Sequence, residues 1–200
     1  MTGSVDLYWL PLGAGGHCVG VNGRVYEAAV AAMQHRRRHD LYHSALEVCV
    51  PAGRFVIEMT PIRDGRGRER GVVAEGAVGS TLVRRLRLFR YENRRWRDGC
   101  IPDAADAVES PRRLTSDCAA ARRLLELVSA APTPVWGRDE LHTGEMWNSN
   151  ALVSWLIVSA GLDPGEARLP RDGRAPGWRA GIVVARRMGG DGIEPPTSWV

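Results

Sequence analysis

Three separated polar segments have the residue types needed for nucleophilic chemistry. The segment MWNSN (146–150) opens the apolar run ALVSWLIVSAGL, so a serine flanked by two asparagines begins what looks like a buried helix. A serine hydroxyl becomes a useful nucleophile when a base lies within hydrogen-bond reach and a third group orients that base. His43 in LYHSALEV and Glu58 in FVIEMT supply both types. We predict Ser149 as nucleophile, His43 as general base, Glu58 as its orienting group, and Asn148 or a backbone amide as the oxyanion donor.

Two β-strands joined by a hairpin must position the base. The runs 41–50 and 54–60 have strand-like composition, and the Pro-Ala-Gly between them suits a three-residue hairpin loop. Side chains alternate between the two faces of a strand, so every second residue shares the face of His43. The register of the hairpin decides whether Glu58 or Glu47 faces that histidine, because a slip of one residue reverses every side chain. The sequence leaves this choice open.

A structural explanation of the same residues also stays open. Asparagine and serine favour helix starts because their side chains accept hydrogen bonds from free backbone N–H groups there. Asn148 or Ser149 would then only cap a helix running from about Ser149 to Ala160. In this interpretation His43 is a hydrogen-bonded strand histidine, and Glu58 is an exposed strand residue.

The order of these motifs resembles a known superfamily. HSALEV (43–48), followed about a hundred residues later by NSN (148–150), is similar to the circularly permuted papain-like fold. Its members include the PPPDE peptidases and the lecithin:retinol acyltransferase-like proteins. In PPPDE members an H-[ST]-x-[IL]-E-V strand carries the catalytic histidine, and an Asn-Cys-Asn segment at a helix start carries the nucleophile. APGWRAG (175–181) is similar to a late P-x-W of that family, so the resemblance covers residues 41–180 or so.

The resemblance implies a hydrolase or acyltransferase that acts on an amide, ester or thioester, but one position departs from it. Ser149 stands where the family has cysteine. A helix dipole contributes about 0.3–1 kcal/mol per charge, and one pKa unit corresponds to about 1.36 kcal/mol, so the helix start cannot ionise a hydroxyl. Ser149 would need His43 to remove its proton during attack. The alternative is a non-catalytic papain-like relative that binds a peptide or acyl ligand.

Other site chemistries fit the sequence less well. The glycine loop GAGGH (13–17) lacks the third glycine of a dinucleotide fingerprint, because Cys18 stands there, and no lysine is available for a phosphate loop. His35, His39 and His43 are spaced by four, but a strand-like sequence interrupts the helix that would align them as metal ligands. The four cysteines form no C-x-x-C pair, so we expect reduced thiols. No metal and no cofactor is predicted.

Composition and charge indicate the partners and the location. All 27 basic residues are arginine, the net charge is +4, and the arginines are interleaved with acids, which is typical of a solvated surface rather than a nucleic-acid groove. We therefore expect a peptide, ester or acyl small molecule as ligand and no nucleic acid. No apolar stretch reaches the length of a membrane span, and the first residues lack a signal-peptide pattern. These features predict a cytoplasmic protein of unknown oligomeric state.

The expected fold is α+β, with a small antiparallel sheet packed against helices in the permuted papain-like manner. Hydrophobic content of 44% supports one domain over residues 1–187, followed by a mobile tail over 188–200. Besides the elements above, we expect a first strand at 5–13, helices at 24–38 and 110–132, a strand at 81–92 and a last strand within 174–187.

Overall fold

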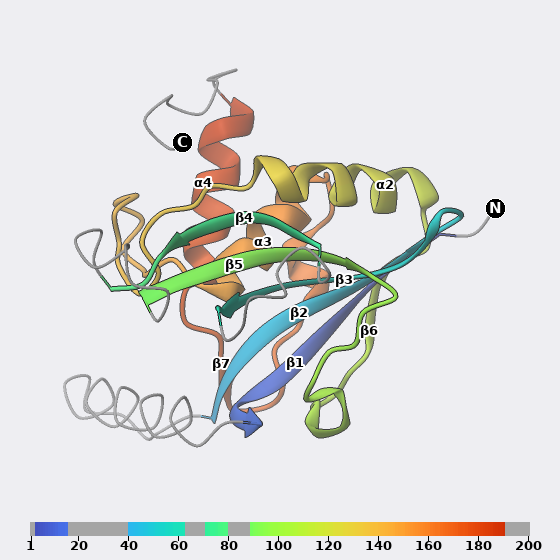
Figure 1. Cartoon of the computed structure of the whole chain (residues 1–200), viewed down its shortest axis with the longest axis horizontal. Helices are drawn as coiled ribbons and strands as arrows, with labels where there is room; N and C mark the ends of the chain where they lie inside the picture. The colour runs from blue at the N-terminus through green and yellow to red at the C-terminus, as the bar shows by residue number, and fades with distance from the viewer. Residues whose placement is uncertain (1–2, 16–39, 63–70, 80–88, 191–200) are drawn as a thin grey trace.

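The structure is a computed structural model that describes residues 3–15, 40–62, 71–79 and 89–190. The described residues form seven strands and three α-helices (Figure 1). The strands are β1 (Ser4–Gly15), β2 (Asp40–Val50), β3 (Gly53–Pro61), β4 (Val72–Ala77), β5 (Arg90–Arg97), β6 (Arg112–Thr115) and β7 (Gly173–Arg174). The helices are α2 (Cys118–Leu127), α3 (Ser149–Ser159) and α4 (Trp178–Gly190), with short 3-10 helices η4 (Ala104–Asp106), η5 (Val128–Ala130) and η6 (Pro164–Glu166).

The strands form one sheet in the order β4-β5-β3-β2-β1-β6, and β7 pairs with β2. All pairs along this path are antiparallel, whereas the short β7 runs parallel to β2. Figure 1 shows α2, α3 and α4 gathered on one side of the sheet. The expected α+β class, with a mainly antiparallel sheet packed against helices, is therefore confirmed.

The main core lies between the sheet and the helices. Strand alternation places every second residue of β1 and β2 on this face, and these side chains are buried: Val5, Leu7, Trp9, Tyr42, Leu46 and Val48. α3 is apolar around most of its circumference and is buried from Ser149 to Ile157, as expected for a helix enclosed by other elements. Because α3 lies in the interior, polar groups at its start must find partners inside the protein.

A second, smaller cluster covers the opposite face of the sheet. It consists of Leu10, Ala45, Val56 and Ile101, the last of which lies just before η4. The partly buried Tyr8 and Ala107 pack against it. Neighbouring residues of β1 and β2 therefore contribute to two different cores.

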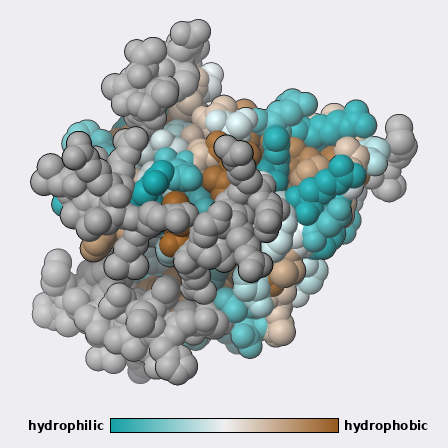
Figure 2. All heavy atoms as spheres, in the orientation of Figure 1, coloured by the Kyte–Doolittle hydropathy of each residue, from teal (hydrophilic) through white to brown (hydrophobic). Residues whose placement is uncertain are grey.

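The exterior carries both polar and apolar side chains. Figure 2 shows hydrophilic residues alternating with small apolar areas on the face seen in Figure 1. Within the described residues, the large hydrophobic side chains that are exposed are Phe89 and Leu169. Scattered single residues of this kind are normal on a protein surface and mark no interface by themselves.

The hairpin of β2 and β3 forms where the sequence predicts it. Its register runs from Leu46 opposite Ile57 to Val50 opposite Gly53. Gly53 has a φ of 137°, a conformation that favours glycine and explains this residue at the turn. The hairpin confirms the two strands expected at 41–50 and 54–60.

Other elements differ from the expectations. The predicted strand over 174–187 is wrong, because α4 begins at Trp178, and its buried residues Ala180, Val184 and Ala185 have helical spacing. The predicted helix over 110–132 is partly wrong, since its first residues form β6. Asp117 caps α2 by accepting hydrogen bonds from the backbone N–H groups of the second and third helical residues at 3.1 and 3.0 Å.

Some expectations lie partly or wholly outside the described residues. The helix at 24–38 falls there entirely, as does most of the strand at 81–92, of which β5 contains the end. α4 continues to Gly190, past the expected start of the tail at 188, and residues 191–200 are not described. Within the described part of the chain, no helix is long and apolar enough to cross a membrane.

Candidate functional site

Asn148 is the N-cap of α3. Its Oδ1 atom accepts hydrogen bonds from the backbone N–H groups of Asn150 and Ala151 at 2.9 and 3.2 Å. Its Nδ2 atom donates to the carbonyl oxygen of Pro176 at 2.8 Å. A Cβ atom at Gly177 would lie 2.4 Å from Asn148 Oδ1, so only glycine allows this close approach. The side chain of Asn148 thus both caps the helix and holds the loop before α4.

Asn150 connects the same helix start to strand β2. Its Oδ1 atom accepts a hydrogen bond from Ser44 Oγ at 2.9 Å, and its Nδ2 atom donates to the carbonyl oxygens of Tyr42 and Pro176, each at 2.9 Å. Asn150 is 2% exposed, so these bonds lie in the interior. We call the set Tyr42, Ser44, Asn148, Asn150 and Pro176 the amide clasp, because two side-chain amides join a strand, a helix and a loop.

Ser149 lies between the two clasp asparagines but does not belong to the clasp. It is 5% exposed, and within the described part of the chain its hydroxyl forms no hydrogen bond. The backbone amides that follow it in the helix, those of Asn150 and Ala151, already donate to Asn148. The predicted nucleophile is therefore buried without a base among the described residues, and two amides that could hold an oxyanion are occupied.

His43 lies on the other face of the sheet. It is opposite Leu10 in the β1–β2 register, while the next residue, Ser44, is opposite Trp9. Residues directly opposite each other in an antiparallel pair share a face. His43 therefore lies on the face of the smaller core with Leu10, whereas Ser44 reaches the start of α3. The structure does not bring the side chains of His43 and Ser149 to the same face.

The environment of His43 favours the neutral imidazole. Burial lowers its pKa to about 4, and the carboxylate of Asp103, in the turn before η4, opposes this shift. Within the described residues the imidazole forms no hydrogen bond or ion pair. A neutral imidazole at pH 7 can accept a proton, but the hydroxyl predicted to supply it lies across the sheet.

The two candidate carboxylates share the face of His43 and bind arginines. Glu47 is opposite Val56, so Glu58, two residues after Val56, also lies on this face. Glu58 forms an ion pair with Arg94 at 2.7 Å, and Glu47 forms one with a different arginine at 2.8 Å. Glu58 is 9% exposed, so the alternative of an exposed Glu58 is wrong. The register thus places both glutamates on the same face of the sheet as His43.

Metal ligation has no support in the described residues. Among them, no group of three or more histidine, cysteine, aspartate or glutamate side chains could hold a metal ion. Two histidines of the spaced row, His35 and His39, lie outside the described part of the chain.

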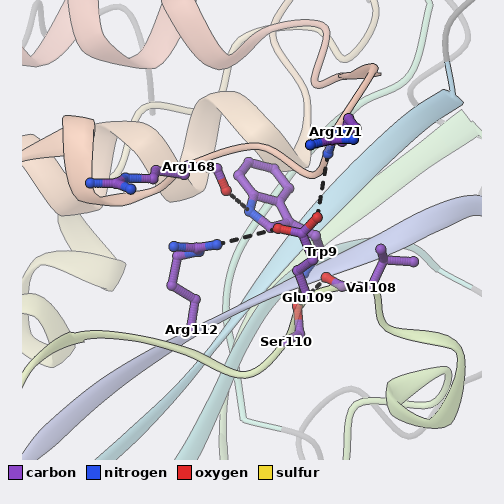
Figure 3. Close-up of polar contacts among 7 residues, drawn as sticks. All are labelled: Trp9, Val108, Glu109, Ser110, Arg112, Arg168 and Arg171. Carbon is purple, nitrogen blue, oxygen red and sulfur yellow. Dashed lines mark hydrogen bonds and ion pairs between the residues drawn. The ribbon is translucent and has the colours of Figure 1, made fainter.

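Sequence reasoning missed a polar cluster beside Trp9 of β1 (Figure 3). We call Glu109, Arg112, Arg168 and Arg171 the arginine corner. Glu109 Oε2 lies 3.4 Å from Arg112 Nη2, and Glu109 Oε1 accepts a hydrogen bond from the backbone N–H of Arg171 at 3.4 Å. The residues come from two segments about sixty positions apart, so no local motif reveals them. In the sequence, arginines interleaved with acids indicate only a solvated surface.

The comparisons with known proteins give no relative. A scan against protein-family models found no match, and searches of curated proteins and of solved structures found none either.

Proposed function

We propose that the chain is a non-catalytic relative of the permuted papain-like proteins, which binds a peptide or acyl ligand without cleaving it. The observation that carries the proposal is the occupied helix start. Asn148 accepts the hydrogen bonds of two backbone amides and donates its own amide to Pro176. A hydrolase needs such donors free, because they stabilise the negative charge that develops on the attacked carbonyl oxygen.

The position of the histidine supports the same proposal. A serine nucleophile requires a base in hydrogen-bond reach, because its hydroxyl does not ionise near neutral pH. The β1–β2 register directs His43 to the face of Leu10, away from the helix start. Position 149 thus has a hydroxyl where the resembled family has a thiol. The base that could activate this hydroxyl, His43, is not within reach.

The ligand class rests on the resemblance of HSALEV and NSN to a superfamily of peptidases and acyltransferases. On this proposal, the chain recognises the acyl or peptide group that the resembled family acts on, but has no nucleophile to attack it. The competing hypothesis is a hydrolase or acyltransferase that uses Ser149 and His43. The two hypotheses differ in the reactivity of one hydroxyl.

Intact mass after treatment with a fluorophosphonate tests this difference on the full chain. We expect no adduct on the wild type or on Ser149→Ala, while a serine hydrolase of known reactivity is labelled under the same conditions. One adduct on the wild type and none on Ser149→Ala would overturn the proposal and establish an activated serine. In that case His43→Ala should also abolish labelling.

Binding is tested separately with a probe that contains both ligand groups. In a protein-detected NMR titration with an N-octanoyl dipeptide amide, we expect saturable shift changes that include the amides at the start of α3. Absence of any shift up to millimolar probe would refute the ligand part of the proposal. The conclusion that the chain has no activated nucleophile would still stand.

A further inference from the structure

Two rigid anchors hold the backbone of the arginine corner. The backbone N–H of Trp9 donates to Ser110 Oγ at 2.8 Å, and Trp9 Nε1 donates to the carbonyl oxygen of Arg168 at 2.9 Å. Trp9 is fully buried and packs against Trp178, with 5.0 Å between ring centroids. Because both chain segments bond to one buried tryptophan, their backbones are held at the same place in the fold (Figure 3).

Glu109 is held weakly and in a strained conformation. Both its contacts, to Arg112 Nη2 and to the Arg171 N–H, are 3.4 Å long, at the outer limit of hydrogen bonding. Its φ is 47°, in the left-handed region that costs energy for a residue other than glycine. The side chain is 48% exposed, so water competes for both contacts. An incoming anion could displace this carboxylate at small cost.

The guanidinium groups around it retain unused donors. Arg168 and Arg171 are exposed, and within the described part of the chain their guanidinium groups form no hydrogen bond or ion pair. Arg112 Nε is buried and has no partner among the described residues. In the view of Figure 3 the side chains of Arg112 and Arg168 extend to the same side of Trp9, and Arg171 lies at the other end of the cluster.

We propose that Arg112 and Arg168, which extend to the same side of Trp9, bind a phosphate group, and that Glu109 occupies part of this site when the phosphate is absent. Once the phosphate has displaced Glu109, the two guanidinium charges match the charge of about −1.5 to −2 that a phosphate monoester carries at pH 7. Arginine forks bind phosphate oxygens through paired, charge-assisted hydrogen bonds. This site is separate from the amide clasp and does not depend on the function proposed for it.

The test is isothermal titration calorimetry of the full chain at fixed ionic strength, with inorganic phosphate and with O-phosphoserine as probes. We expect saturable binding that weakens by about tenfold in Arg168→Gln and in Arg112→Gln, because each removes a charged donor. Glu109→Gln should strengthen binding, since it removes the competing carboxylate. Tighter binding of O-phosphoserine would assign the site to phosphorylated molecules, and equal binding would assign it to free phosphate; both outcomes support the site.

Arg122→Gln is the matched control, because Arg122 is an exposed arginine on α2 outside the corner. Its loss lowers the net charge equally but should leave phosphate affinity unchanged. An equal weakening in Arg122→Gln would overturn the proposal by showing that only net charge attracts phosphate. Absence of saturable binding, or binding unaffected by Arg168→Gln and Arg112→Gln, would also overturn it. Unchanged thermal unfolding of the variants shows that the fold is intact.

Discussion

The amide clasp and the arginine corner are both polar clusters that join distant segments of the chain, but they use their hydrogen-bonding groups in opposite ways. Every clasp amide atom has a partner at 2.8–3.2 Å in the interior. In the corner, the two contacts of Glu109 are 3.4 Å long, and two guanidinium groups have no partner within the described residues. The donors of the amide clasp hold the fold together, whereas donors of the arginine corner remain available to a ligand.

The contrast shows that a sequence motif alone does not identify a binding site. The NSN motif (148–150) indicates a catalytic helix start, yet both its asparagines hold the fold together and leave few donors for a substrate. The corner matches no motif but keeps the free charged groups that a ligand needs. Availability of donors in the folded protein, rather than residue type, separates groups that can bind a charged ligand from groups that hold the fold together.

The largest expected effect comes from breaking the clasp. Asn150→Leu keeps a similar volume but leaves the carbonyl of Tyr42 and the hydroxyl of Ser44 buried without their partner. At about 1–3 kcal/mol for each unsatisfied group, we expect a loss of about 4 kcal/mol in the free energy of unfolding. Urea denaturation followed by tryptophan fluorescence measures this loss.

Asn93→Leu is the matched control for that experiment. Asn93 is also a fully buried asparagine, but neither its Oδ1 nor its Nδ2 atom has a hydrogen-bond partner among the described residues. The same substitution should therefore be neutral or stabilising here, since it removes a desolvated amide that gains nothing in return. Equal losses at Asn150 and Asn93 would show that packing, not hydrogen bonding, accounts for the clasp.

The sequence predicts these regions unequally, because it encodes local signals better than long-range ones. The β2–β3 hairpin and the start of α3 follow from a turn glycine and a capping asparagine, each acting within a few residues. The face on which His43 lies depends on how β1 pairs with β2, and a one-residue slip would reverse it. The bond between Ser44 and Asn150 spans 106 positions, so no local pattern encodes it.

α4 shows a different source of error. The consecutive β-branched residues Ile182, Val183 and Val184 favour a strand. The buried positions Ala180, Val184 and Ala185 nevertheless recur at helical spacing and decide the outcome. Packing against α3 outweighs the β-branched residues, because intrinsic propensities are small beside the burial of an apolar face. A prediction from residue type alone therefore gives the wrong element here.

A pH titration provides the next largest effect and separates His43 from the clasp, whose amides do not ionise. The pKa of His43 is about 4 in the folded protein, below its ordinary value of 6.5, so the unfolded chain binds more protons between these values. Stability should therefore fall as pH decreases from 6.5 to 4, by at most about 3 kcal/mol. Partial exposure of the residue makes the actual loss smaller.

His43→Gln should flatten this part of the pH profile relative to the wild type, as measured by urea denaturation at several pH values. Ser129→Ala is the control, because Ser129 is exposed and its side chain has no titratable group in this range. An unchanged profile in His43→Gln would mean that the pKa of His43 is not lowered in the folded state.

The smallest expected effect tests how loosely the arginine corner is held. Glu109→Gly removes two 3.4 Å contacts but relieves a φ of 47°, so the free energy of unfolding should stay the same or rise by up to about 1 kcal/mol. His142→Gly, at a φ of 51° and without the ion pair, measures the backbone contribution alone. If Glu109→Gly destabilises while His142→Gly stabilises, then Glu109 binds its arginines firmly. The corner would then resemble the clasp, with its donors committed to the fold and little affinity left for phosphate.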